Sequence, residues 1–109
     1  MPVIETSENN SNEILKTRWY NNNYNEVKIA ILKYAQANNA ILNGVNDDYM
    51  EFLFNVNFKE YFVKCTEYKG LIAVDLKITT SFFKAKKAII IFYEEINQFL
   101  KLEGLGLLA

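Results

Sequence analysis

The chain has 109 residues, of which 50% are hydrophobic, and it carries a formal net charge of −1 and no histidine. This length and composition predict one globular domain, and the near-neutral charge argues against a dedicated nucleic-acid or polybasic membrane binder. Cys65 is the only cysteine, which excludes an intrachain disulfide and a zinc site built from cysteine and histidine. The first residues lack the charged and apolar regions of a signal peptide, so we expect a cytoplasmic protein. We expect no cofactor.

Residues 1–10 offer little apolar surface to bury and are predicted to form a mobile N-terminal tail ahead of a single α+β domain over 11–109. Ser11 or the residue after it is placed to cap a short helix that runs through Trp19. The run Asn21–Asn23 then ends this helix, because asparagine side chains compete for backbone hydrogen bonds.

A second helix is predicted from Asn23 to about Ala37. Asn23 is a suitable N-cap, and Glu26 stands three residues later, which is the spacing of a capping box. The helix is apolar on more than one side, so we expect it either to be buried on more than one side or to contact a partner as well as the sheet. The next segment, Ala40–Val45, is either a short edge strand or a loop.

Three strands in a meander are predicted between Met50 and Ile78. Apolar residues alternate with polar ones through Met50–Val56, Glu60–Thr66 and Ile72–Ile78, and this period of two is typical of strands with one buried face. Gly70 stands in the second turn, where a positive φ is tolerated. The last strand would form an outer edge of this sheet.

A long C-terminal helix is predicted from a cap at Thr79–Ser81 to Gly104. Its apolar residues repeat at helical spacing: Ala85, Ile89, Phe92, Ile96 and Phe99. The predicted fold class is therefore α+β, a three- or four-stranded antiparallel meander packed by N-terminal helices and a long C-terminal helix.

The residues Asp75 and Lys77 raise the question of a metal site. The stretch IAVDLKIT resembles the strand that carries the D-x-K pair in PD-(D/E)xK nucleases, including the XisH-like branch, and that resemblance implies Mg²⁺-dependent phosphodiester cleavage. Further carboxylates for such a site would come from four acidic residues: Glu26, Asp48, Glu51 and Glu60. The alternative is an ordinary solvent-facing pair on a sheet, and on this interpretation no catalytic or metal-binding residue is predicted.

Aromatic residues are the candidates for partner binding. Aromatic side chains are the usual anchors of protein interfaces, and more of them are present than one small core needs. The candidate partner-binding residues are Trp19, Tyr20, Phe62, Phe82 and Phe83. The alternative is that the domain packs these rings beneath its own loops.

A wider resemblance concerns the order of the elements. A leading helix, the strand-rich stretch NFKEYFVKCTEYKGLIAVDLKI and a helix ending at Ile96–Gly104 together resemble the YbjN and type III secretion chaperone-like fold family over roughly residues 24–106. The resemblance implies a small, non-enzymatic and often dimeric module that binds segments of other proteins.

The sequence therefore predicts a small non-enzymatic protein-binding module, either chaperone-like or a regulatory adaptor. Its partner would be another protein or a second copy of the chain in a homodimer, and neither nucleic acid nor membrane is expected. One alternative is a metal-dependent PD-(D/E)xK-like nuclease or a degenerate relative. A further alternative is a phage- or plasmid-type inhibitor or immunity protein.

Overall fold

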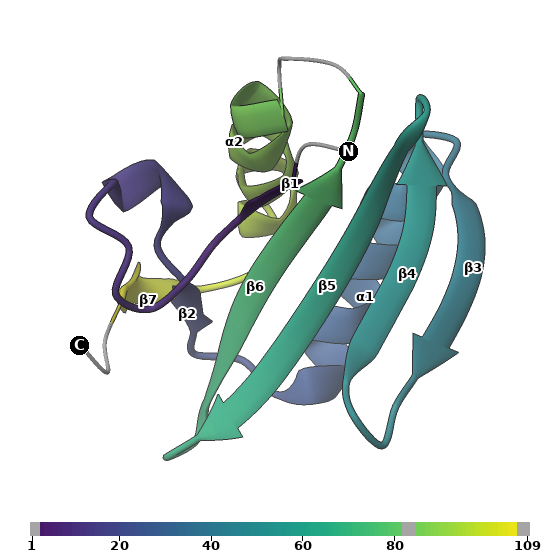
Figure 1. Cartoon of the computed structure of the whole chain (residues 1–109). Coiled ribbons are helices and arrows are strands. Elements are labelled where there is room, and N and C mark those ends of the chain that lie inside the picture. The colour runs from purple at the N-terminus through teal and green to yellow at the C-terminus, as the bar shows by residue number, and fades with distance from the viewer. Residues whose placement is uncertain (1–2, 82–84, 107–109) are drawn as a thin grey trace.

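The structure is a computed structural model that describes residues 3–81 and 85–106 (Figure 1). The elements in chain order are β1 (Val3–Glu5), the 3₁₀ turn η1 (Glu13–Leu15), β2 (Arg18–Tyr20), α1 (Tyr24–Ala37), β3 (Ile41–Asn46), β4 (Glu51–Val56), β5 (Lys59–Tyr68), β6 (Leu71–Thr79), α2 (Ala85–Asn97) and β7 (Leu102–Leu105).

All strands of the described chain belong to one seven-stranded sheet. Its order is β3-β4-β5-β6-β2-β7, with β1 also paired to β6, and every strand pair is antiparallel. The predicted fold class is therefore wrong, because the sheet is larger than a meander of three or four strands. The predicted meander is present within it as β4, β5 and β6. Of the two alternatives for Ala40–Val45, the strand is correct, because β3 runs from Ile41 to Asn46.

The N-terminal residues are strands where we expected a tail and a helix. β1 and β2 pair with β6 one after the other, β1 at Lys77–Thr79 and β2 at Ile72–Val74. They cover the edge of β6 that β5 leaves free, so the predicted outer strand is central. The physical reason is that an unpaired edge of a nine-residue strand presents many unsatisfied backbone groups.

The C-terminal helix is shorter than predicted. α2 ends at Asn97, and the chain then turns back to form β7, which pairs with β2. Gly104, the expected helix terminator, lies opposite Trp19 within this strand pair. Local helical periodicity does not predict where α2 ends, because the last residues form a strand only by pairing with the otherwise unpaired edge of β2.

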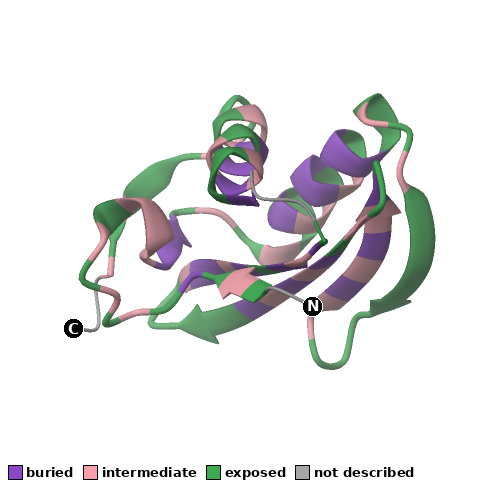
Figure 2. Cartoon of the chain, turned by 45° about the horizontal axis from the view of Figure 1, so that its top comes forward, coloured by how far each residue is buried: buried purple, intermediate pink, exposed green. Residues whose placement is uncertain are grey.

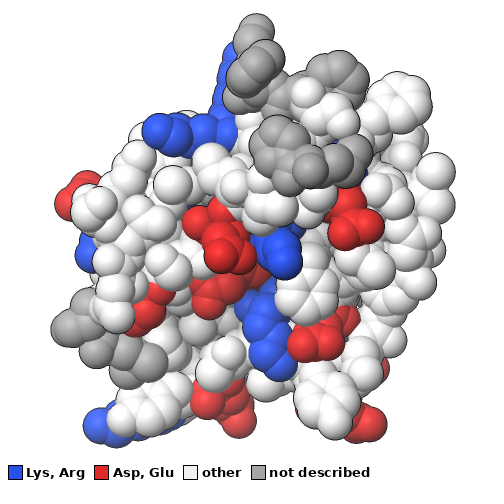
Figure 3. All heavy atoms as spheres, viewed as in Figure 1, with Lys and Arg blue, Asp and Glu red and all other residues white. Residues whose placement is uncertain are grey.

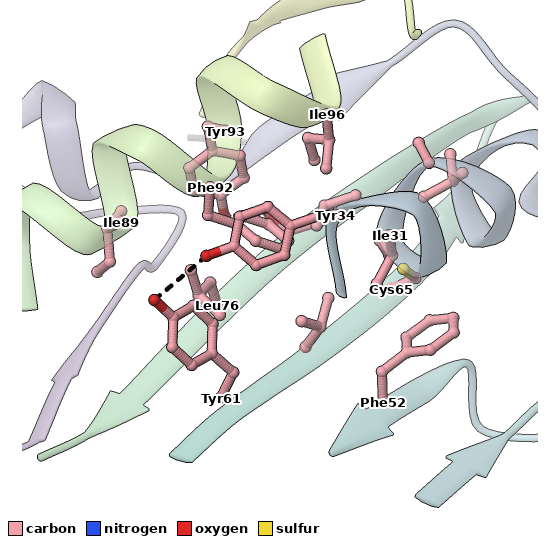
Figure 4. Close-up of a cluster of buried hydrophobic side chains, with 14 of the residues drawn as sticks. Ile31, Tyr34, Phe52, Tyr61, Cys65, Leu76, Ile89, Phe92, Tyr93 and Ile96 are labelled. Carbon is pink, nitrogen blue, oxygen red and sulfur yellow. Dashed lines mark hydrogen bonds between the residues drawn. The ribbon is translucent and has the colours of Figure 1, made fainter. Parts of the chain in front are cut away.

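Both α-helices lie on the same face of the sheet, and the other face is open (Figures 1 and 2). The core between helices and sheet includes Phe54, Val74 and Ile89, which are fully buried together as the strand phase predicted. Figure 4 shows Phe92 of α2 against Tyr34 of α1, whose hydroxyl donates a hydrogen bond of 3.3 Å to the Tyr61 hydroxyl.

The capping box that the sequence predicts at Asn23 and Glu26 is confirmed. The Asn23 side chain accepts from the backbone N–H of Glu26, and the Glu26 carboxylate accepts from the backbone N–H of Asn23, which completes the capping box of α1. Cys65 is buried in the core, and burial raises the pKa of its thiol to about 12. Neither α-helix of the described residues has the length and apolar character that a membrane crossing requires.

Candidate protein-binding surface

β3, which lies at one end of the sheet with β7 at the other, is the most exposed element of the sheet. All six of its residues are exposed to solvent, including Ile41 at 69%, Leu42 at 50% and Val45 at 37%. Its sequence, ILNGVN, holds no charged residue and no proline. An edge strand with unpaired backbone groups, apolar side chains and none of the usual charges is a template for a further strand.

A bulge in β3 places two of these apolar side chains on the same face. Leu42 pairs with Phe54 and Val45 pairs with Phe52, and the register shifts between Leu42 and Gly44. Phe52 and Phe54 are buried beneath the helices. Directly paired residues share a face of the sheet. Leu42 and Val45 therefore lie on the helix-covered face, beside the buried Phe54 and Phe52, and extend this apolar layer onto the exposed edge strand.

The helix beside this edge adds apolar surface. The Lys28 ammonium donates to the Asp47 carboxylate at 2.9 Å, and the Tyr24 hydroxyl donates to the same carboxylate at 2.7 Å, so this side of α1 faces the turn after β3. Leu32, four residues after Lys28, lies on the same side of the helix. It is half-buried, and the neighbouring Ile29 is 47% exposed.

A shallow groove of about 240 Å³ lies on the open face of the sheet next to β3. Gly44 pairs with Leu53, which pairs in turn with Phe62. Apart from the two chain neighbours of Gly44, no described residue has an atom within 4 Å of the place that a Gly44 Cβ would occupy, so the missing side chain leaves the groove open. Half-buried Leu53 and Phe62 line it, which makes it an apolar extension of the β3 edge.

The structure gives different places to the predicted partner-binding residues. Phe62 lines the groove beside β3. Trp19 is 2% exposed and donates its indole N–H to Glu8, and Tyr20 is fully buried with its hydroxyl donating to Asn97. Both rings are therefore used within the fold. Phe82 and Phe83 lie outside the described residues.

Asp75, the acidic residue of the D-x-K pair, is held by two threonines. The Thr6 and Thr17 hydroxyls donate to the same carboxylate oxygen, over 2.7 and 2.6 Å. Burial raises the pKa of Asp75, the charges of Glu5 and Glu8 add to this rise, and the threonine hydrogen bonds oppose it. The carboxylate therefore fastens the N-terminal segment to β6.

The other carboxylates of the predicted metal site do not gather around Asp75. Lys64 stands between Glu51 and Asp75 in the strand register, 3.6 Å from the Glu51 carboxylate. Glu60 pairs with Thr79, four residues along β6 from Asp75, which corresponds to ~13 Å. Within residues 3–81 and 85–106, no three acidic or cysteine side chains are grouped to hold a metal.

The two remaining acidic residues do not join Asp75 in a group that could hold a metal, within the described part of the chain. Glu26 is engaged in the capping box of α1, and Asp48 is exposed in the turn between β3 and β4. Figure 3 shows the open face, where basic side chains lie between acidic ones over the middle strands.

Sequence reasoning missed Ile41, Leu42 and Val45 as surface residues. An apolar segment of six residues is equally consistent with a buried strand, and only the sheet order places this one at the edge. One feature of the sequence could have indicated a binding edge: the segment carries none of the charges or prolines that usually protect an edge strand from pairing.

Comparisons of the chain with protein-family models, with curated proteins and with solved structures find no match. The resemblance to the YbjN and type III secretion chaperone-like family therefore stays a hypothesis.

Proposed function

We propose that this chain is a small non-enzymatic protein-binding module that binds an extended segment of a protein along β3. The single observation that carries the proposal is the exposed, uncharged edge formed by Ile41–Asn46. A strand added there would satisfy the free backbone groups of β3 through main-chain hydrogen bonds. The apolar residues on the two faces of the sheet beside β3 would select the side chains of the bound segment.

Each face of the sheet would contribute to specificity. On the helix-covered face, an added strand would place alternate side chains against Leu42 and Val45. On the open face, the intervening side chains would reach the groove beside Gly44, where Leu53 and Phe62 provide apolar contact. We therefore expect bound segments to carry apolar residues at alternate positions on both faces.

The surroundings of Asp75 support a non-enzymatic role. Its carboxylate accepts two threonine hydroxyls and stands next to Lys64 in the strand register, so it acts as a structural fastening. Cys65 is buried, and burial holds its pKa well above the physiological range, which disfavours the thiolate that nucleophilic chemistry needs.

A peptide-display selection tests the proposal without knowledge of the natural partner. Random peptides are selected on the wild-type chain and then measured on Leu42→Lys, which places a charge on the edge, and on Ile91→Lys, which alters an exposed apolar residue of α2. We expect selected peptides to bind wild type and Ile91→Lys alike and to lose affinity for Leu42→Lys. Peptides that bind all three proteins equally would contradict binding at β3.

A further inference from the structure

We propose that the segment bound along β3 is the β3 strand of a second copy of this chain, paired antiparallel about a two-fold axis perpendicular to the sheet. This inference rests on the proposed function and specifies its partner. The two sheets would join into one continuous sheet, and both copies of α1 would lie on the same face of it. Such an interface is isologous, because the same edge is used by both copies.

The register follows from the two apolar residues that β3 places on the helix-covered face. When two identical strands pair antiparallel about a two-fold axis, the residue numbers of any two opposite residues add up to the same value. Placing Leu42 opposite Val45 of the partner also places Val45 opposite Leu42 of the partner, and Asn43 then faces Gly44. If Leu42 faced its own copy, Val45 would face Asn39, and if Val45 faced its own copy, Leu42 would face Asp48. Of these three registers, only the first pairs apolar with apolar twice.

The charges around β3 favour the antiparallel arrangement. Asp47 and Asp48 follow the strand directly, and no acidic residue lies between Asn38 and Asn46. An antiparallel pair separates the two acidic turns, one at each end of the joint, and brings each near the uncharged Asn38–Ala40 segment of the other copy. A parallel pair would bring the two acidic turns together, where like charges repel.

The helices would add to the interface above the joined strands. The side of α1 that faces the turn after β3 carries half-buried Leu32 beside exposed Ile29. Across a two-fold axis these side chains would meet their own copies and cover Leu42 and Val45. Six-residue strands with this small apolar cover form an interface at the low end of the usual size range, so we expect association at micromolar concentration.

Disulfide cross-linking tests the register. Leu42→Cys and Val45→Cys are prepared separately, mixed and oxidised at micromolar concentration, with the buried Cys65 leaving one accessible thiol in each chain. The mixture should form the 42–45 disulfide, because opposite residues in a strand pair lie within the ~7 Å that a disulfide can bridge. Each variant alone should form little, since its thiols would be three residues out of register, ~10 Å apart.

Sedimentation equilibrium tests the self-association. We expect wild type and Ile91→Lys to dimerise, and Leu42→Lys to associate about tenfold or more weakly, because a charged side chain replaces an apolar one at two symmetric places. A monomeric wild type would overturn the self-pairing. If that monomer still binds display-selected peptides along β3, the proposed function stands without the homodimer, and if it does not, both fall. A dimer that gives no mixed disulfide would overturn the register.

Discussion

The Thr17 hydroxyl donates a hydrogen bond of 2.6 Å to the Asp75 carboxylate, and the two residues are separated by 58 positions in the chain. Thr6 donates to the same oxygen over 2.7 Å from the other side. One carboxylate therefore joins the start of β2 and the end of β1 to the middle of β6. This fastening explains why segments as short as three residues can complete the sheet next to a nine-residue strand.

The first prediction concerns the pH dependence that Asp75 contributes. Its pKa is raised above the ordinary value of 3.8, so the native state binds this proton more tightly than the unfolded chain does. The contribution of Asp75 to the free energy of unfolding is therefore largest below that ordinary value and declines as the pH rises through the raised pKa. Asp75→Asn should abolish this decline and leave the protein at least as stable as wild type at pH 7, because the amide oxygen can still accept both hydroxyls.

Urea unfolding at pH 4 and pH 7 measures this difference. The matched control is Asp48→Asn, which changes an exposed carboxylate in the turn between β3 and β4. A loss of stability at pH 7 in Asp75→Asn, greater than that in the control, would show that the negative charge itself stabilises the fold. In that case the proximity of Lys64 would outweigh the cost of burial.

The second prediction concerns the core. Phe54 is fully buried and stacks on Tyr61 with a ring-centroid distance of 5.3 Å. Phe54→Ala should lower the free energy of unfolding by ~3–5 kcal/mol through lost transfer energy and the cavity left behind. Phe58, at the tip of the hairpin between β4 and β5, is 89% exposed, so Phe58→Ala should change stability by less than ~0.5 kcal/mol. Equal effects in urea unfolding would contradict the placement of Phe54.

The middle of this fold was predictable because its sequence pattern is strictly local. In β4, in β5 as far as Thr66 and in β6 apart from the buried Ala73, buried and less buried residues alternate with the period that the sequence shows. The cap of α1 was equally predictable, because Asn23 and Glu26 stand three residues apart and need only each other. Short-range chemistry decides both features.

The two ends of the chain were not predictable in the same way. Nothing local in Arg18–Tyr20 indicates a strand, since these three residues are ordered by β6 on one side and β7 on the other. Leu102–Leu105 is ordered by β2 in turn. The candidate surface has the same origin: Leu42 and Val45 are exposed because β3 is outermost, which depends on how the whole sheet is assembled.

The third prediction concerns catalysis. The chain should not cleave DNA or RNA in the presence of Mg²⁺ or Mn²⁺, because Lys64 lies between Glu51 and Asp75 in the strand register and the two threonines hold the Asp75 carboxylate. A plasmid-nicking and RNA-degradation assay over a range of metal concentrations measures this. Cleavage that disappears in both Asp75→Asn and Lys77→Ala, with both variants still folded, would contradict the non-enzymatic interpretation.

The fourth prediction concerns two hairpins of the same design. The loop between β4 and β5 consists of Asn57 and Phe58, with φ of 48° and 66°, and the loop between β5 and β6 consists of Lys69 and Gly70, with φ of 51° and 79°. Both two-residue loops require positive φ at each position, which is the type I′ pattern that favours glycine second. Phe58 therefore occupies the place that Gly70 fills in the next hairpin.

Replacing Phe58 with glycine should stabilise the protein. The left-handed conformation costs an L-residue roughly 1–2 kcal/mol, and glycine returns about 0.5–1 kcal/mol of that through its greater freedom in the unfolded chain. Phe58→Gly should thus raise the free energy of unfolding by roughly 0.5–1 kcal/mol, whereas Gly70→Ala should lower it by a similar amount. Urea unfolding of the two variants beside Phe58→Ala measures this. A destabilised Phe58→Gly would mean that the ring makes contacts that outweigh the strain of its backbone.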